Sequence, residues 1–591
     1  MGRLDRVLFL ALAGAVWAYA ILRAVLVPLA HDECASVLWL VRSGEWLPYH
    51  AHWDANNHYL SSGIGLLATR LLGEAPFVLR AGSLLAFVPY AWSVLRIGTH
   101  VRQRAVRLCL CATMLLCPFL LDFFSLFRGY SIEMAGWLLA LDGLLRYAAS
   151  MTARHLGQAL AGLLLACAAI VALVPAWALV LLLLAALQVG ARPQPSRGSR
   201  WAQVAAWVVF GALPLLWACQ VAFALKERGL LYHGSTGGFF HVTVTSLCRY
   251  VLGSATAITG AFISTLLLGC GVYAVRQALR ARTWRDPLLL VTALLWCDVL
   301  ARILMARTFG INYPEDRAAL HLVPLALLAF ALAVDRLAAH RASAVWAAAL
   351  LLVLPLRTLF TANLDHTLAW PEQAVPERFM AQARADTTAH ALLIGGQHQL
   401  ALVWPMNAQW RGHTVPSMQV TSFPEGPHDL RIVDERHLRD ALKGYHAIDS
   451  ARGPGLWLLE RDQPLRLDPV ITLHAPEQSG RGEFAELAHL PDSLLRAGPV
   501  QLAVDVPLTL PSASPDVRLV LEVNDTSGNK LFYDALAPLA RRPTWCGERL
   551  RQVWRLPALP GARRAVLYFH DPAGVIVSHG IARTAVSAIR E

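Results

Sequence analysis

Long apolar runs constrain this chain more than any other feature. Eleven segments of roughly 17–25 residues are apolar enough to cross a bilayer as helices. They are approximately residues 7–29, 76–97, 106–121, 130–148, 156–172, 173–190, 201–223, 255–275, 287–305, 317–335 and 343–361. Hydrophobic residues make up 56% of the 591-residue chain and charged residues only 16%. The pattern therefore predicts a polytopic helical membrane protein.

The arginines between these runs predict the topology. They fall in the N-terminus and in every second link, such as Arg96–Arg107 and Arg276–Arg285, which all lie on one side if the count is right. The positive-inside rule makes that side cytoplasmic. The segments 30–75, 122–129, 224–254 and 306–316, and the tail from about 363, then face outward. This use of arginine also accounts for the net charge of +12 without nucleic acid, which we exclude as a partner.

The chain is expected to divide into three parts. Residues 1–362 form the transmembrane domain, in which 32–47 and 57–72 have helical apolar spacing but are too short or polar to span, and are predicted as helices along the membrane surface. Residues 363–464 alternate between strand and helix patterns and predict a small α/β domain. Residues 465–591 carry short alternating strands with turn residues, typical of a jelly-roll β-sandwich.

An acidic pair, Asp32 and Glu33, directly follows the first apolar run. Adjacent carboxylates at the outer end of a membrane helix can supply a general base and its partner, or bind a cation. The alternative is a solvated pair of charges at a helix end. Ionisable groups at a membrane face usually mark function, so we favour a catalytic role.

The following stretch, HAHWDANNH, is unusually polar for this chain. His50, His52, Asp54 and His58 could bind a divalent cation, but their spacing matches no strong metal motif. Hydrogen bonding to substrate by members of this set, with Asn57, is favoured over metal binding; interfacial polarity alone is the other interpretation. No metal or cofactor is assigned, and a divalent cation stays possible.

Two further outer segments carry candidate anion-binding groups. Asp122 precedes the FRGYS run, which contains Arg128 and Tyr130, and an outward arginine can hold a lipid phosphate or merely reach the headgroups. Tyr313, Glu315 and Arg317 lie near the start of a later helix, with His321 one turn deeper. They could hold an anionic headgroup or form a local salt-bridged helix start. The glycine-rich segment 226–250 is a mobile lid or simply a loop.

Taken together, these motifs resemble the C-type glycosyltransferase superfamily, whose nearest named members are the dolichyl-phosphate-mannose protein mannosyltransferases and the bacterial lipid A aminoarabinose transferases. The resemblance covers roughly residues 5–360 and rests on the acidic pair, NHYL, PFVLRAGSLL, FRGYSIEMAGWLLAL and PEDRAALHLVPLALLAF in that order. It implies a polyprenyl-phosphate sugar donor, with Asp32 as the base that deprotonates an acceptor hydroxyl and Glu33 supporting it. Arg128 and Arg317 would hold the donor phosphate.

The expected function is therefore transfer of a hexose or pentose, with inversion at the anomeric carbon, to a glycan, lipid or protein acceptor on the periplasmic side of a bacterial inner membrane. The β-trefoil insert of the protein mannosyltransferases has no counterpart, which puts a protein acceptor in doubt. Two alternatives remain. A transporter or flippase would place ionisable groups near the bilayer midplane, where only Asp298 and Arg302 are found. A non-catalytic glycan-binding assembly subunit would leave Asp32 and Glu33 without a catalytic role.

Overall fold

The computed structural model describes residues 2–189, 197–231, 233–383, 392–421, 426–511, 514–574 and 576–590. By its contacts the chain forms two compact units. The first comprises Met1–Leu26 and Trp46–Leu364, and the second comprises Val27–Glu45 and Asp365–Glu591. The short segment 27–45, which carries Asp32 and Glu33, thus belongs with the C-terminal part.

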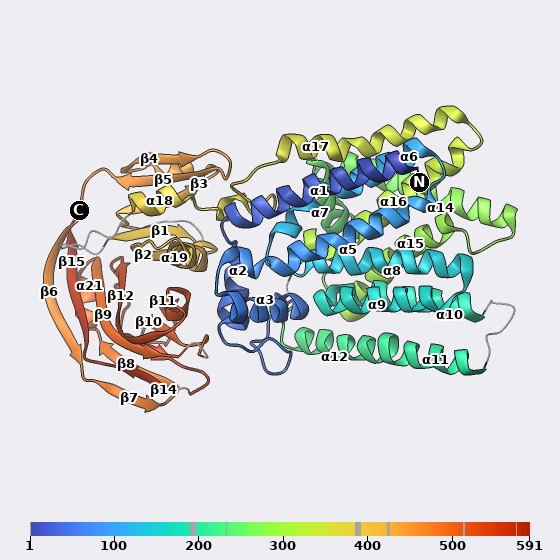
Figure 1. Cartoon of the computed structure of the whole chain (residues 1–591). Helices are drawn as coiled ribbons and strands as arrows, with labels where there is room; N and C mark the ends of the chain where they lie inside the picture. The colour runs from blue at the N-terminus through green and yellow to red at the C-terminus, as the bar shows by residue number, and fades with distance from the viewer. Residues whose placement is uncertain are drawn as a thin grey trace. The chain divides into compact units, whose positions relative to one another are not determined.

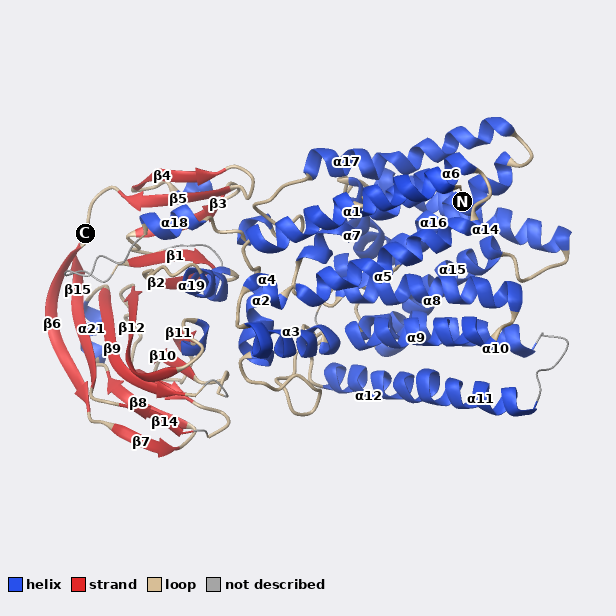
Figure 2. Cartoon of the chain, in the orientation of Figure 1, coloured by secondary structure: helices blue, strands red, loops and turns tan. Residues whose placement is uncertain are grey.

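The first unit is helical (Figures 1 and 2). Seven of its described helical segments are long and apolar enough to cross a membrane, or eight if one bent pair is a single span. They are Arg3–Leu26 (α1), Ala81–His100 (α5 and η2), Val171–Val189 (η4 and α10), Gln203–Glu227 (ending in α12), Ala257–Ala281 (α14), Pro287–Phe309 (α15) and Ala342–Thr361 (ending in α17). The bent pair is Arg104–Leu115 (α6) with Pro118–Ser125, where Pro118 starts a new helix and the axis turns by 44°.

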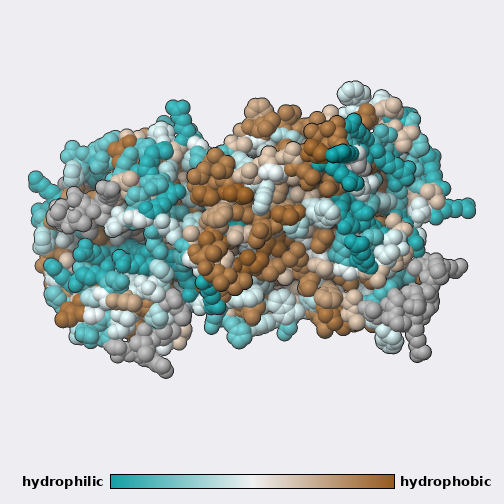
Figure 3. Space-filling model, in the orientation of Figure 1, coloured by the Kyte–Doolittle hydropathy of each residue, from teal (hydrophilic) through white to brown (hydrophobic). Residues whose placement is uncertain are grey.

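The three other expected spans are helices too. Ala153–Ala169 (α9) and Leu322–Ala338 (α16) have only 17 residues each, and Tyr130–Ser150 (α8) carries Glu133, Asp142 and Arg146. All eleven expected segments are therefore helical, while the number that crosses the bilayer stays a prediction. Apolar side chains gather on the surface of the helical unit (Figure 3), as a lipid-facing surface requires. Exposed apolar residues of this unit include Leu71, Leu85 and Trp92.

Both segments predicted as surface helices contain helix, with different boundaries, and their position along a membrane stays a prediction. Tyr59–Leu72 (α3) agrees with the expectation. The earlier one consists of His31–Ser36 (α2) and a π-helical turn over Val37–Val41, so it ends before Leu47. The chain turns at Gly44, whose φ of +79° is a left-handed conformation that glycine adopts without a steric penalty.

The second unit contains an α/β sheet and two antiparallel sheets. The first sheet has the order β2-β1-β3-β5-β4, with β1 (Leu393–Gln397), β2 (Ser417–Thr421), β3 (Leu430–Asp434), β4 (Tyr445–Ala451) and β5 (Leu456–Arg461). The strands β1, β2 and β3 are parallel, and the helix Leu400–Trp410 (α19) connects β1 to β2. This arrangement confirms the predicted α/β character of the region.

The remaining strands form a four-stranded sheet, β11-β10-β13-β8, and a sheet of order β6-β15-β9-β14-β7 in which β12 also pairs with β9. Alternating burial along β9 (Val500–Leu510) and β10 (Arg518–Asn524) shows that each presents one face to a core. The other strands are β6 (Arg466–Ala475), β7 (Gln478–Arg481), β8 (Phe484–His489), β11 (Lys530–Leu536), β12 (Trp545–Leu556), β13 (Arg564–His570), β14 (Ile576–His579) and β15 (Ala582–Arg590).

Candidate functional site

The acidic pair lies in the first turn of α2, in the second unit. Glu33 is buried, and its Oε2 accepts a hydrogen bond from the Ala30 backbone N–H at 3.0 Å, which caps the start of the helix. Asp32 is half-buried, and its backbone carbonyl accepts the Ser36 hydroxyl at 2.9 Å. Of the two carboxylates, Glu33 therefore has a clear structural task.

Contacts with the C-terminal part fix the position of the segment 27–45. The side chain of Asn407 on α19 bonds both the backbone N–H and the carbonyl of Leu29, each at 3.0 Å. Gln373 Oε1 accepts the His31 N–H at 2.8 Å, and Arg42 donates to Gln409 at 2.9 Å. The helix that carries Asp32 is thus anchored by side chains more than 300 residues away in the sequence.

Within the helical unit, four predicted residues come together around the start of α8. The His58 ring lies edge-on to Tyr130 with ring centroids 5.1 Å apart, and the Arg128 guanidinium lies 5.7 Å from the centre of the Tyr130 ring. His58 and Arg128 are almost fully buried. Burial, with the positive charges of Arg128 and Arg317, holds the pKa of His58 well below its usual range. His58, Arg128, Tyr130 and Arg317 are called the arginine–histidine cluster below.

Small residues allow the loop that carries Arg128 to pack closely. A Cβ on Gly129 would lie 2.7 Å from the Ala169 carbonyl oxygen and 2.9 Å from His58 Cβ. The Ser83 hydroxyl lies 2.6 Å from the Leu126 carbonyl and 3.2 Å from that of Arg128, within hydrogen-bond distance of both acceptors. The backbone on either side of Arg128 is therefore held at α5 and α9, which limits the positions its side chain can adopt.

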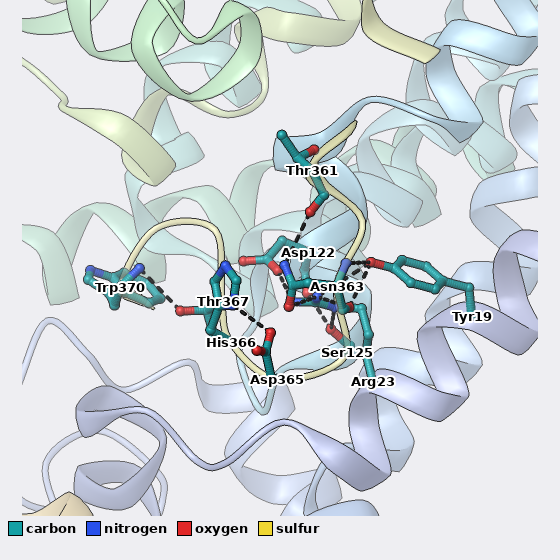
Figure 4. A network of polar contacts seen from close by, with 10 residues as sticks. All are labelled: Tyr19, Arg23, Asp122, Ser125, Thr361, Asn363, Asp365, His366, Thr367 and Trp370. Carbon is teal, nitrogen blue, oxygen red and sulfur yellow. Dashed lines mark hydrogen bonds and ion pairs between the residues drawn. The ribbon is translucent and has the colours of Figure 1, made fainter. Parts of the chain in front are cut away.

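Other predicted residues make contacts of their own. Asp122 forms a buried ion pair with Arg23, which also donates to Ser125 Oγ at 3.3 Å (Figure 4). Asn57 donates to the Trp46 carbonyl at 3.0 Å and accepts from the Ser62 hydroxyl at 3.1 Å. Asp54 accepts the Asn56 backbone N–H at 2.8 Å, and His52 is half-buried in the same loop. Roles of these residues in substrate binding stay predictions.

The segment around Tyr313 and Glu315 is tied to the glycine-rich loop. The Tyr313 backbone N–H bonds the Ser235 carbonyl at 3.0 Å, and the Thr243 hydroxyl bonds the Pro314 carbonyl at 2.6 Å. The Asp316 N–H donates to Ser246 Oγ at 2.9 Å. The second half of the expected loop is helical, over Phe240–Val244 and Thr245–Leu252, and these contacts hold it against the segment 313–316.

Deeper in the helical unit lies a buried charged network. Asp298 Oδ2 on α15 is 2.8 Å from Arg302 Nε and 3.0 Å from His321 Nε2, and Arg302 also donates to the Ala172 carbonyl at 3.2 Å. Asp298 and His321 are fully buried. Glu133, one turn along α8 from Tyr130, is buried as well. The sequence analysis identifies Asp298, Arg302 and His321 but not Glu133 or Arg23. A charged residue inside an apolar helix is the sequence feature that could have identified these two.

The polar residues that the structure describes are predicted to bind substrate or a divalent cation, and their grouping bears on the second possibility. In the part of the chain that the structure describes, no three or more His, Cys, Asp or Glu side chains are grouped so that they could hold a metal ion. His50, His52, Asp54 and His58 are all within that part. Of these residues, His58 alone belongs to the arginine–histidine cluster.

No protein-family model and no curated protein matches the sequence. Several solved structures are similar to it. ArnT from Cupriavidus metallidurans in the apo state shares 13% identity and a TM-score of 0.43, covering 77% of this chain and 97% of its own. The structure of the same protein bound to undecaprenyl phosphate has 14% sequence identity and a TM-score of 0.42, with the same coverage of both chains. The arabinofuranosyltransferase AftD from Mycobacteria has 12% sequence identity and a TM-score of 0.39, and the match covers 99% of this chain and 61% of the AftD chain. Each of these matches has less than 15% identity and a TM-score below 0.5, so the likeness is distant.

Proposed function

We propose that the chain is a membrane glycosyltransferase that moves a sugar from a polyprenyl-phosphate donor to an acceptor on the periplasmic side of the inner membrane. The observation that carries this proposal is the arginine–histidine cluster. It combines a buried imidazole with the nearby guanidinium of Arg128 and with the charge of Arg317, which also lowers the pKa of His58, in a unit with an apolar surface. Guanidinium groups bind phosphate with strong, charge-assisted hydrogen bonds.

The proposed chemistry needs a general base, for which the sequence indicates Asp32. This base takes the proton of the acceptor hydroxyl, and the hydroxyl oxygen attacks the anomeric carbon of the donor sugar. The bond from that carbon to the phosphate oxygen breaks, and the phosphate leaves with the electron pair. Arg128 and Arg317 stabilise its developing charge, which is the largest contribution that such a site makes to rate. Attack opposite the leaving group inverts the anomeric configuration.

The other predicted residues have supporting roles in this proposal. Glu33 caps α2 and so fixes the direction of Asp32. Tyr313 and Glu315 would border the donor headgroup through the segment that leads to Arg317, while His52 and Asp54 would contact the acceptor. A glycan, lipid or protein can serve as acceptor, and a divalent cation is not needed for the steps above.

The test is sugar transfer by the purified protein in lipid nanodiscs, with a panel of polyprenyl-phosphate sugars as donors. Asp32→Asn should reduce kcat by at least about 10²-fold, as expected for loss of a general base. Arg128→Ala and Arg317→Ala should each reduce kcat/KM strongly. Glu45→Gln and Arg70→Ala change exposed charges of the same types and should leave transfer intact. Full activity of Asp32→Asn would remove Asp32 as the base.

The buried Asp298–Arg302–His321 network favours a second candidate function. Ionisable groups inside a membrane domain often line a path for ions or polar substrates. On this alternative the protein is a transporter or flippase of lipid-linked sugars. A fluorescent lipid-linked sugar that changes leaflet in proteoliposomes, without any glycosyl transfer, would support it over the transferase.

A further inference from the structure

His58 occupies a distinctive place in the arginine–histidine cluster. It immediately precedes α3, and its side chain is 5% exposed. Its ring faces Tyr130 and is in hydrogen-bond contact with the backbone of Ala169 at the end of α9. The close approach of Gly129 to both His58 and Ala169 holds this arrangement in place.

The hydrogen bonds of His58 determine its tautomer. Nε2 has no hydrogen-bond partner among the described residues, so the bond to Ala169 is made through Nδ1. The backbone group that can meet a ring nitrogen of His58 there is the Ala169 carbonyl, which lies next to Gly129. A carbonyl oxygen only accepts, so Nδ1 carries the proton and a neutral imidazole presents a lone pair at Nε2.

The surroundings keep this imidazole neutral. Burial, together with the positive charges of Arg128 and Arg317, lowers the pKa of His58 well below its usual range. A buried acceptor with no partner is unfavourable, and such groups are rare in folded proteins. At neutral pH the cluster therefore combines two cations with one unsatisfied hydrogen-bond acceptor.

We propose that His58 Nε2 accepts a hydrogen bond from a sugar hydroxyl of a ligand whose phosphate is held by Arg128 and Arg317. This inference rests on the proposed function, because it identifies the ligand of the same cluster as a phosphosugar. A lone pair at Nε2 repels the oxygens of a phosphodiester, which carries no proton to donate. The ligand atom that meets Nε2 must therefore bring its own hydrogen, and a hydroxyl of the sugar next to the phosphate does so.

Binding must uncover this acceptor, since Nε2 is shielded from solvent. The side chains that lie close by are Tyr130 and Arg128. Movement of the Arg128 guanidinium onto a phosphate would leave room beside His58. Catalytic and binding contacts commonly tighten only when the ligand is present.

Two substitutions of His58 separate its two hydrogen bonds. Asparagine places an amide N–H near the position of Nδ1, so His58→Asn keeps the donor toward Ala169 and removes the acceptor. Glutamine places its amide near the position of Nε2, so His58→Gln keeps an acceptor there. A structural role of His58 would make His58→Asn the milder change, whereas the proposed role makes His58→Gln the milder change for sugar recognition.

The experiment compares dissociation constants of undecaprenyl phosphate and undecaprenyl-phosphate mannose for the full chain in nanodiscs at pH 7.5. His58→Asn should weaken binding of the mannosyl lipid by about tenfold and that of undecaprenyl phosphate by less than about twofold. His58→Gln should recover part of the difference.

Two results would overturn the inference. They are equal weakening of both lipids by His58→Asn, or no weakening of either lipid by His58→Asn, which would mean that water alone satisfies Nε2. If no donor supports transfer and His58→Asn still weakens binding of the mannosyl lipid selectively, the inference stands and the proposed transferase falls. If transfer occurs and His58→Asn behaves as wild type, the transferase stands and the inference falls.

Discussion

Arg23 in the last turn of α1 donates to both the backbone carbonyl and the side-chain oxygen of Asn363, at 2.7 and 3.0 Å, across 340 residues of sequence. The Tyr19 hydroxyl also donates to the Asn363 carbonyl, at 3.0 Å (Figure 4). Arg23 and Asn363 lie just before Leu26 and Leu364, the two places where the chain leaves the helical unit for the other unit. Hydrogen bonds therefore connect the two chain segments at which the helical unit ends, and Asp122 neutralises the charge of Arg23.

Breaking the Arg23–Asp122 pair should destabilise the helical unit. Both side chains are buried, so Arg23→Ala leaves the Asp122 carboxylate without its ion-pair partner, at a cost of about 3–5 kcal/mol. Arg6→Ala, on the exposed surface of the same helix, is the control and should have little effect. Thermal unfolding in detergent measures the difference. The double variant Arg23→Ala/Asp122→Ala should lose less than the sum of the single variants, and strict additivity would contradict the pairing.

Breaking the ion pair between Asp298 and Arg302 should also destabilise the helical unit, whether or not substrate is bound. Asp298→Ala leaves Arg302 buried without its carboxylate and should cost about 3–5 kcal/mol. Replacing both residues by apolar ones, as in Asp298→Leu/Arg302→Met, should restore much of the stability because no uncompensated charge remains. The measurement is the unfolding midpoint of purified protein. If the double variant also fails to transport or transfer while it is stably folded, the network has a functional role as well.

Asp316 predicts a pH dependence. Burial and the neighbouring Glu315 raise the pKa of Asp316 to about 6, against the opposing effects of Arg317, Arg249 and Ser246. A carboxyl whose pKa is raised on folding favours the folded state while it is protonated. This contribution is complete below the unfolded pKa of about 4 and is lost as the pH rises through about 6.

Asp316→Asn should therefore match the wild type near pH 4 and be more stable than it at pH 7.5. Asparagine also tolerates the φ of +50° at this position. Differential scanning calorimetry at the two pH values measures the unfolding temperatures of both proteins. A stability difference between the proteins that does not vary with pH would show that Asp316 does not titrate in this range.

Gly129 should be intolerant of a side chain. A Cβ there would meet the Ala169 carbonyl oxygen at 2.7 Å and His58 Cβ at 2.9 Å, so Gly129→Ala must displace the loop that carries Arg128. We expect reduced stability and at least about tenfold weaker binding of undecaprenyl phosphate, the cost of roughly one displaced charge-assisted contact. Gly157→Ala is the matched control, since nothing lies within 4 Å of a Cβ at that helical position. Equal behaviour of the two variants would rule out the close packing around His58.

The sequence could predict the site only in part, and particular residues show why. Arg128 and Arg317 were marked because a charge next to an apolar helix is conspicuous, and His58 because it lies in a polar island. Nothing in their spacing distinguished His58 from His50 or His52, which are nearby in sequence and outside the cluster. Asp122, like Arg128, is a charged residue next to an apolar helix, yet its ion-pair partner is Arg23, about a hundred residues earlier.

By itself, the sequence determined the helical membrane part, its eleven helical segments and the sheet-rich tail, because hydrophobic length and alternation are local properties of the chain. Only the tertiary structure decided that the segment with Asp32 packs with the tail, that Glu33 caps a helix, and that His58 is buried near Tyr130 and Arg128. Those outcomes depend on which atoms meet across hundreds of residues. Burial and hydrogen bonding then fix the charge and tautomer of each group, and neither can be read from local sequence.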